Sequence, residues 1–431
     1  MRIAIIGAAG RDFHDYLTYY RRNKNYKVVC FFATQIPNIE NRVFPIGNIK
    51  IFSFDEIEKF SNKIEHAFLS FSDVSNEDVM NIASKLLSLN INFSILSPFK
   101  TMLKSRKPVI SICATRTGAG KSTVARKVSL LLKKEGLKVA IVRHPMPYGD
   151  LKRQMFQEFK SLNDLKKYKC SLEEIEEYEP HIRNGFTVYA GIDYRKILRY
   201  VEKKYDVIVW DGGNNDLPFF KPTLHIVVAD PFRIGDEFKY YHAFLNCKIA
   251  DIFVINKINV VNKNSVEKLK ENLLKINKKA KVILARSEIS VENVEIIKNK
   301  RVLVVEDAPT VTHGKLSFSA GYIAAKKYNA KEIVDARKFA IGSIKKFYKK
   351  YPHIQKILPS FGYGEKQIKE LENVINKVNC DSVVLGDMVD LGKFVRINKP
   401  YTKVYYELKD LNNRLAKEIH HFVEKIKNRL N

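Results

Sequence analysis

Residues 109–123 read VISICATRTGAGKST: an apolar run, then two glycines, a lysine and a serine. The apolar run predicts a strand and the residues after Lys121 predict a helix, so the glycines lie in a strand–loop–helix turn. Gly118 and Gly120 permit backbone conformations that a side chain would block. Backbone N–H groups at the start of a helix bind anions. The stretch therefore predicts a phosphate-binding loop and a nucleoside triphosphate as its ligand; the alternative is a glycine-rich turn without a nucleotide.

The loop departs from the strict GxxxxGK[ST] pattern, since Thr115 stands where the first glycine is expected. It resembles the GTxTxxGKT loop of the dethiobiotin synthetase-like branch of P-loop NTPases. Lys121 is expected to be catalytic and to reach the β- and γ-phosphates, and Ser122 to ligate Mg²⁺. Arg116, where relatives with a deviant loop carry a second lysine, is expected to neutralise developing phosphate charge. The predicted nucleotide-binding residues of the loop are Thr115, Arg116, Thr117, Gly118, Ala119, Gly120, Lys121, Ser122 and Thr123.

A second motif occupies residues 206–216, DVIVWDGGNND. A hydrophobic strand would deliver Asp211 at its carboxyl end, beside the phosphate loop of a parallel sheet. A carboxylate there can hold Mg²⁺ through water, so Asp211 is a predicted metal-binding and catalytic residue. Asn214 and Asp216 are candidates for orienting water or substrate, or else form a polar turn.

A third motif, Asn256-Lys257-Ile258-Asn259, follows a predicted strand and resembles the NKxD guanine-recognition element of GTPases. Asn259 replaces the final Asp, and an amide leaves one guanine donor facing an N–H group, at a cost of about 1–3 kcal/mol. An amide suits adenine better, so we favour ATP over GTP. Asn256, Lys257 and Asn259 are predicted to bind the nucleotide, or else form a solvated strand end.

The acceptor of the phosphoryl group is expected beside residues 143–154, RHPMPYGDLKRQ. Guanidinium and ammonium groups suit an anionic metabolite, and His144 can act as a general acid or base near neutral pH, or be structural. Residues 310–314, which follow the last predicted strand of the NTPase segment, include hydroxyl side chains, a histidine and a glycine. Such residues are typical either of a second anion-binding site or of a helix cap. The predicted substrate-binding residues are Arg143, His144, Lys152, Arg153, Asn214, Asp216, Thr312 and His313.

Composition limits the class of protein. The 431 residues carry a net charge of +28, which attracts polyanions, but the lysines are dispersed and no nucleic-acid-binding motif appears. We therefore expect no nucleic-acid partner. No apolar run is long enough to span a membrane, and the first residues do not resemble a signal peptide. Five scattered cysteines without a CxxC spacing fit a reducing cytoplasm, so we expect a cytoplasmic protein.

The alternation of short apolar runs with helical patterns predicts an α/β fold throughout, with three layers and mostly parallel sheets. We expect a Rossmann-like domain at 1–105, a P-loop NTPase domain at 106–306 and a C-terminal α/β region at 307–431, in a chain that can form homo-oligomers. The turn with Gly7 and Gly10 resembles a dinucleotide-binding turn. However, the next strand ends without the acidic residue that binds a ribose, so no redox cofactor is expected.

Over nearly its whole length the chain resembles a prokaryotic family of P-loop GTPases labelled cyclic 2,3-diphosphoglycerate synthetase-like. The resemblance is carried by GAAGRDF, LKSRKPVISICATRTGAGKS, VRHPMPYGDL, YEPHIRNGF, VWDGGNND, VEDAPTVTHG and GYG. It implies a Mg²⁺-dependent kinase or synthetase that transfers the γ-phosphoryl group of ATP or GTP to a phosphoglycerate and closes a phosphoanhydride. Asn259 stands where the family has Asp. The alternative function is a regulatory or chaperone-type GTPase whose nucleotide state controls a protein or RNA partner.

Overall fold

The computed structural model describes residues 1–7, 10–34, 41–144, 146, 149–213, 216–307, 311, 317–354, 356–360, 365–386, 391–393 and 395–428. Contacts between residues group the chain into two compact units. The first comprises residues 1–160, 186–284 and 410–431, and the second comprises residues 161–185 and 285–409. The boundaries at residues 105 and 306 stay a prediction; contacts place residues 1–160 in one unit and divide residues 161–306 between the two units. Among the described helices, none is both long and apolar enough to cross a membrane.

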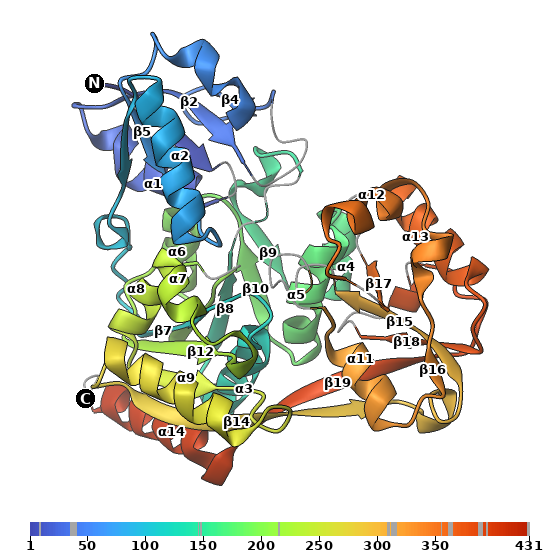
Figure 1. Cartoon of the computed structure of the whole chain (residues 1–431). Coiled ribbons are helices and arrows are strands. Elements are labelled where there is room, and N and C mark those ends of the chain that lie inside the picture. Colours follow the sequence, from blue (N-terminus) through green and yellow to red (C-terminus); the bar gives the residue numbers. More distant parts are fainter. Residues whose placement is uncertain are drawn as a thin grey trace. The chain divides into compact units, whose positions relative to one another are not determined.

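The amino-terminal part of the first unit is a sheet in the order β3-β4-β2-β1-β5-β6. Figure 1 labels three of its strands, β2, β4 and β5. Its strands are parallel except for the β3–β4 pair. Alternate side chains of β1 enter different cores: Ile3 and Ile5 join one apolar cluster, Ala4 and Ile6 another. Both faces are therefore buried, as expected for a doubly covered sheet. The elements are β1 (Arg2–Gly7), α1 (Arg11–Thr18), β2 (Lys27–Ala33), β3 (Val43–Phe44), β4 (Ile49–Ser53), β5 (His66–Leu69), α2 (Asn76–Ser88) and β6 (Asn92–Ile95).

The second sheet of this unit has the order β14-β13-β12-β7-β11-β8-β10-β9. All its neighbours are parallel except β9 and β10. The central strands are buried along their whole length, which explains their continuous Val and Ile runs. The strands are β7 (Val109–Ala114), β8 (Val139–Arg143), β9 (Gln157–Phe159), β10 (Thr187–Ala190), β11 (Val207–Asp211), β12 (Leu224–Ala229), β13 (Ile252–Ile255) and β14 (Lys281–Val291, of which the first four residues belong here).

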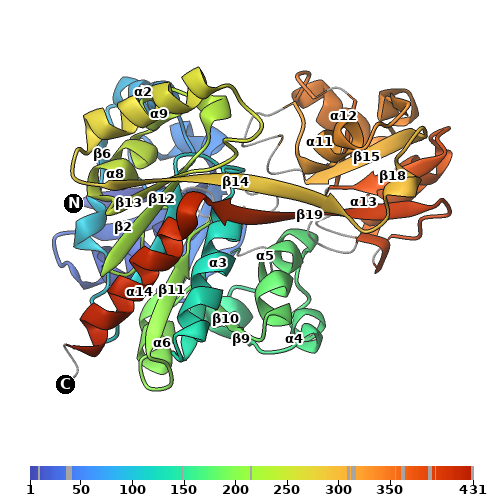
Figure 2. The same cartoon turned by 90° about the horizontal axis from the view of Figure 1, so that it is seen from below.

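Helices cover this second sheet, and the last of them comes from the far end of the chain. Helix α14 packs against α3, and Figure 2 shows the two side by side. Its apolar side, which includes Ile419 and Val423, is buried, and His420 lies 3.0 Å from the carboxylate of Glu135. The helices are α3 (Lys121–Lys134), α6 (Tyr194–Val201), α7 (Asp236–Lys239), α8 (Tyr241–Ile249), α9 (Lys263–Ile276) and α14 (Arg414–Lys427).

The second unit is also α/β, with strand order β16-β15-β18-β19-β14 and β17 paired to β15. Strand β15 sends Leu303 and Val305 to one apolar cluster and Val302 and Val304 to another. The predicted α/β class with mostly parallel sheets is therefore confirmed in both units. The elements are α4 (Leu162–Lys167), α5 (Leu172–Arg183), β15 (Arg301–Asp307), α11 (Ala320–Lys327), β16 (Glu332–Ile333), α12 (Gly342–Lys350), β17 (Leu358–Ser360), α13 (Glu365–Lys377), β18 (Ser382–Leu385) and β19 (Tyr401–Asp410).

Candidate active site

The predicted phosphate loop joins β7 to α3. Gly118 has φ +82° and Gly120, the residue before the first turn of α3, has φ +100°. Both values lie in the left-handed region that favours glycine. The Thr123 hydroxyl donates to the Gly120 carbonyl oxygen at 2.6 Å, and the Thr115 N–H donates to the Val228 carbonyl oxygen at 2.9 Å. The loop therefore has the strand–loop–helix form that anion binding requires.

Side chains from two neighbouring loops hold the carbonyl groups of the phosphate loop. Asn256 donates through Nδ2 to the Ala119 oxygen at 3.0 Å, and Lys257 donates through Nζ to the Gly118 oxygen at 2.6 Å. Arg233 donates to the Thr117 oxygen at 2.5 Å. Binding these carbonyls from outside leaves N–H groups of the loop as the groups offered to a ligand, although the Ala119 N–H donates to the Arg116 oxygen at 3.3 Å. Asn256 and Lys257, predicted from the sequence to bind the nucleotide, therefore contact the phosphate loop itself, whereas Asn259 is exposed.

Buried Asp230 anchors these cations. Its Oδ2 lies 2.9 Å from Lys257 Nζ and 3.0 Å from Arg233 Nη2. Burial by itself would raise the pKa of Asp230, but Lys257 and Arg233 outweigh it and hold the pKa below its usual value. The carboxylate thus stays ionised and fixes both side chains that support the loop.

Asp211, at the carboxyl end of β11, is fully buried between two cations. Its Oδ1 lies 2.9 Å from Lys121 Nζ, and its Oδ2 lies 2.7 Å from Arg143 Nη1. The register explains the second contact, because Arg143 lies opposite Asp211 in the parallel β8–β11 pair. Burial lowers the pKa of Lys121 and Asp211 raises it, with a net value below the usual one. Arg143, predicted from the sequence as a substrate ligand, is fully buried and holds Asp211.

The chemistry of Ser122 and Asp211 fits the magnesium ion that was predicted from the sequence. Ser122 lies in the first turn of α3 and Asp211 ends the strand next to β7, so a hydroxyl and a carboxylate end on the same side of the sheet. Within the described residues, no group of three or more His, Cys, Asp or Glu side chains is placed to hold a metal ion. The residue types therefore suit an ion bound mainly by phosphate and water, as in P-loop NTPases.

Arg116 is buried among acidic and aromatic side chains. Its Nη1 lies 2.5 Å from Asp73 Oδ1 and its Nε 3.3 Å from Asp236 Oδ2. The guanidinium carbon lies 3.8 Å from the centre of the Tyr240 ring. These contacts give Arg116 partners in both the amino-terminal segment and α7, in addition to its place in the phosphate loop.

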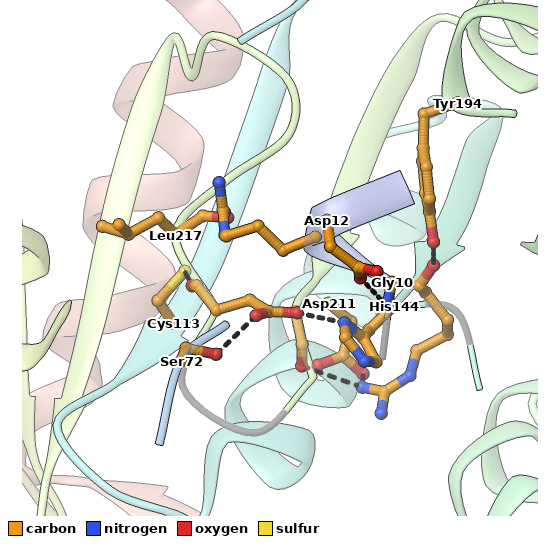
Figure 3. A network of polar contacts seen from close by, with 12 residues as sticks. Gly10, Asp12, Ser72, Cys113, His144, Tyr194, Asp211 and Leu217 are labelled. Carbon is orange, nitrogen blue, oxygen red and sulfur yellow. Dashed lines mark hydrogen bonds and ion pairs between the residues drawn. The ribbon is translucent and has the colours of Figure 1, made fainter. Parts of the chain in front are cut away.

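His144 follows β8, and its Nδ1 contacts Asp216 Oδ2 (Figure 3). The Ser72 hydroxyl donates to the other carboxylate oxygen of Asp216 at 2.6 Å. Burial would raise the pKa of Asp216, but His144, Arg11 and Ser72 hold it well below its usual range. The His144 side chain keeps 17% of its surface exposed and Asp216 only 3%. A carboxylate that orients a partly exposed imidazole is an arrangement that moves protons.

The amino-terminal segment contributes to this site residues that the sequence analysis did not assign. The Arg11 guanidinium donates to the Leu217 carbonyl oxygen, and His14 stacks on Phe219 with ring centres 4.2 Å apart. Ser72 and Asp73 reach Asp216 and Arg116. The available signal was the Gly7–Gly10 turn, which marks a strand end where functional side chains gather in α/β proteins.

Some predicted residues do not join the site. Lys152 and Arg153 are exposed, and Arg153 lies 3.9 Å from Asp150. Asn214, Thr312 and His313 lie outside the described residues. The site therefore brings together a phosphate loop, a buried Lys–Asp–Arg group and a His–Asp pair. Such a set can bind a polyphosphate and handle a proton of a second reactant.

Comparison with known proteins gives one extensive sequence relative. The arginine synthetase ArcE of Thermococcus kodakarensis is 51% identical over 428 residues, covering 97% of this chain and 96% of the relative. No protein-family model matches the chain. Two solved structures are similar at low identity. LpxK from Aquifex aeolicus in complex with ATP has 14% identity and a TM-score of 0.44, covering 80% of this chain and 95% of that one. The hydrogenase maturation factor HypB from Archaeoglobus fulgidus has 17% identity and a TM-score of 0.29, covering 42% and 81%.

Proposed function

This chain belongs to the same family as the arginine synthetase ArcE of Thermococcus kodakarensis, and from this premise we propose that it is a nucleotide-dependent synthetase with arginine as its product. The observation that carries the proposal is the phosphate loop, whose Lys121 contacts Asp211, together with the His144–Asp216 pair. We take ATP as the nucleotide, because an amide at position 259 suits adenine better than guanine.

The chemistry of arginine identifies the class of acceptor. A phosphate-loop enzyme activates an oxygen atom, and the guanidinium carbon of arginine carries only nitrogen. The precursor therefore has an oxygen in place of one guanidinium nitrogen, as in a ureido group. That oxygen attacks the γ-phosphorus and ADP leaves; a nitrogen nucleophile such as ammonia then adds to the carbon and expels phosphate. The ureido oxygen ends in inorganic phosphate, which balances the reaction.

The residues of the site take distinct roles in this proposal. Lys121 leaves Asp211 for the γ-phosphate, where its charge is needed in the transition state. His144, oriented by Asp216, accepts the proton that ammonium loses when it becomes a nucleophile. Magnesium, held by Ser122 and Asp211, would supply charge neutralisation on the β- and γ-phosphates. Main-chain N–H groups of the phosphate loop, among them those of Gly118, Gly120 and Lys121, position the triphosphate.

The expected phosphoglycerate acceptor has less support from the geometry. Arg143 is buried on Asp211, and Lys152 and Arg153 are exposed, so these cations do not gather at His144. Asp216 acts electrostatically on buried Asp15, whose pKa burial raises to about 6, and Arg11 lies near both carboxyl groups. A neutral acceptor group fits such surroundings better than a doubly phosphorylated one.

An oxygen-isotope experiment tests the proposal. The chain is incubated with ATP, ammonium and a ureido amino acid labelled with ¹⁸O, and arginine and phosphate are analysed by mass spectrometry. We expect arginine and ADP in equal amounts, with the label in phosphate, and neither product with Lys121→Ala. A parallel panel of phosphoglycerates tests the other acceptor. Nucleotide hydrolysis that no small acceptor accelerates would overturn the proposal and favour the regulatory GTPase.

A further inference from the structure

The loop at residues 70–73 links β5 to α2 and buries its polar side chains. Ser70 is 1% exposed, Ser72 is 7% exposed, and the Asp73 side chain has 4% of its surface exposed. Asp73 has φ +63°, a conformation that side chains other than Asn, Asp and Gly adopt at a cost. A connection between a strand and a helix needs neither buried hydroxyls nor a buried charge. These features indicate that the loop has partners that fix it.

The first partner is the His144–Asp216 pair. The Ser72 hydroxyl donates to Asp216 Oδ1 at 2.6 Å, while Asp216 Oδ2 contacts His144. Each carboxylate oxygen thus has its own partner, so Ser72 limits rotation of the carboxylate away from the imidazole. A hydrogen bond to the ionised form also keeps the carboxyl group charged, in line with the low pKa of Asp216.

The second partner is the phosphate loop. Asp73 Oδ1 lies 2.5 Å from Arg116 Nη1, and the Thr117 hydroxyl donates to Asp73 Oδ2 at 3.3 Å. Asn256 and Lys257 hold the carbonyl groups of the next two loop residues, Ala119 and Gly118. The phosphate loop is therefore held from the amino-terminal segment as well as from the NKIN segment.

We propose that the 70–73 loop is a positioning element of the active site, in which Ser72 orients Asp216 and His144 and Asp73 fixes the phosphate loop through Arg116 and Thr117. The inference rests on the proposed function for the reaction that His144 serves. According to this inference, the amino-terminal segment not only forms its own sheet but also positions residues that take part in the reaction. The two side chains act on different steps, because Asp216 lies at the proton-handling pair and Arg116 in the nucleotide-binding loop.

Four single substitutions in the full-length chain test this assignment. Ser72→Ala removes the hydroxyl, and Ser72→Cys keeps its volume with a weaker donor in case the alanine variant does not fold. Asp73→Asn removes the charge that faces Arg116. Ser94→Ala is the matched control, because the Ser94 hydroxyl bonds His66 at 2.9 Å in the same sheet without contacting the site. Nucleotide Kd is measured by calorimetry, kcat at saturating nucleotide, and folding by the thermal midpoint.

We expect the Ser72 variant to change mainly kcat and the Asp73 variant to change mainly nucleotide Kd. Ser72→Ala lowers kcat about ten- to hundredfold, the effect of one hydrogen bond to a charged group, and leaves nucleotide Kd within about threefold. Asp73→Asn raises nucleotide Kd by a similar factor and affects kcat less. Parallel changes in kcat, Kd and thermal midpoint in both variants, or kinetics equal to those of Ser94→Ala, would overturn the proposal. If the wild-type chain makes no arginine, the proposed product is wrong. The different effects of the two variants can then still be measured as nucleotide Kd and as the rate of nucleotide hydrolysis.

Discussion

Replacing Asp211 by Asn tests the central electrostatic arrangement, because it keeps the shape of the side chain and removes its charge. The fully buried carboxylate contacts Lys121 at 2.9 Å and Arg143 at 2.7 Å. Removing one partner of a buried ion pair costs about 3–5 kcal/mol, since the charge left behind is neither hydrated nor paired. We expect the nucleotide-free variant to lose that much stability. The amide still accepts one hydrogen bond, which favours the lower end of the range.

The triphosphate should reverse part of this loss. In the wild type, Lys121 must leave Asp211 to reach a phosphate, whereas in Asp211→Asn the ammonium has no competing carboxylate. With EDTA present, ATP is therefore expected to raise the thermal midpoint of the variant more than that of the wild type, although turnover is lost. Denaturant unfolding and thermal denaturation, each with and without ATP, measure both effects.

The matched control is Asp206→Asn, at the opposite end of β11, where the carboxylate accepts a backbone N–H from Lys138 at 2.8 Å. Its stability should change by a smaller amount and its response to ATP should equal that of the wild type. The reasoning would be refuted if Asp211→Asn were as stable as the wild type, or if ATP in EDTA stabilised both proteins equally.

Three further changes have defined outcomes. Gly120→Ala should weaken nucleotide binding at least tenfold in calorimetry, because the new Cβ would lie 2.2 Å from Asn256 Nδ2. Its control is Gly136→Ala, where φ is +83° and no atom lies within 4 Å of the new Cβ, so that the free energy of unfolding should fall only by the backbone strain of about 1–2 kcal/mol. Lys257→Met should weaken ATP and GTP equally, since its ammonium holds a loop carbonyl at 2.6 Å; a change in the ATP/GTP ratio would contradict this role. Burial lowers the pKa of His14 from 6.5 to about 3, so the unfolded chain binds more protons than the folded chain between these pH values. The free energy of unfolding should therefore fall as pH decreases below 6.5, by up to about 1.4 kcal/mol per pH unit. His14→Gln should reduce this pH dependence in denaturant unfolding, and an unchanged pH dependence would refute the assignment.

The features predicted from the sequence are those encoded locally. The phosphate loop needs only a buried strand, two glycines and a helix start, all within residues 109–134. The sheet order then brings Asp211 beside it, since β11 neighbours β7. A charged residue at a strand end in an α/β chain is therefore informative even without an alignment.

The roles of charged partners were not predictable in the same way. Arg143 was expected to meet a substrate, but its cross-strand neighbour is a buried aspartate, a pairing that depends on strand order. Arg116 and Asp73 are 43 residues apart, and Ser72 and Asp216 are 144 apart. Contacts of this separation depend on how the two sheets of the unit pack, which periodicity and spacing do not report.

The packing of α14 on α3 has a consequence for synthesis of the protein. Helix α3, which starts at Lys121, packs against a helix that is translated much later, and Glu135 meets His420, which lies 285 positions further along the chain. In a nascent chain, the part of α3 that α14 covers therefore stays exposed until residues 414–427 have emerged from the ribosome. Truncation before residue 410 should leave that part of α3 exposed to solvent.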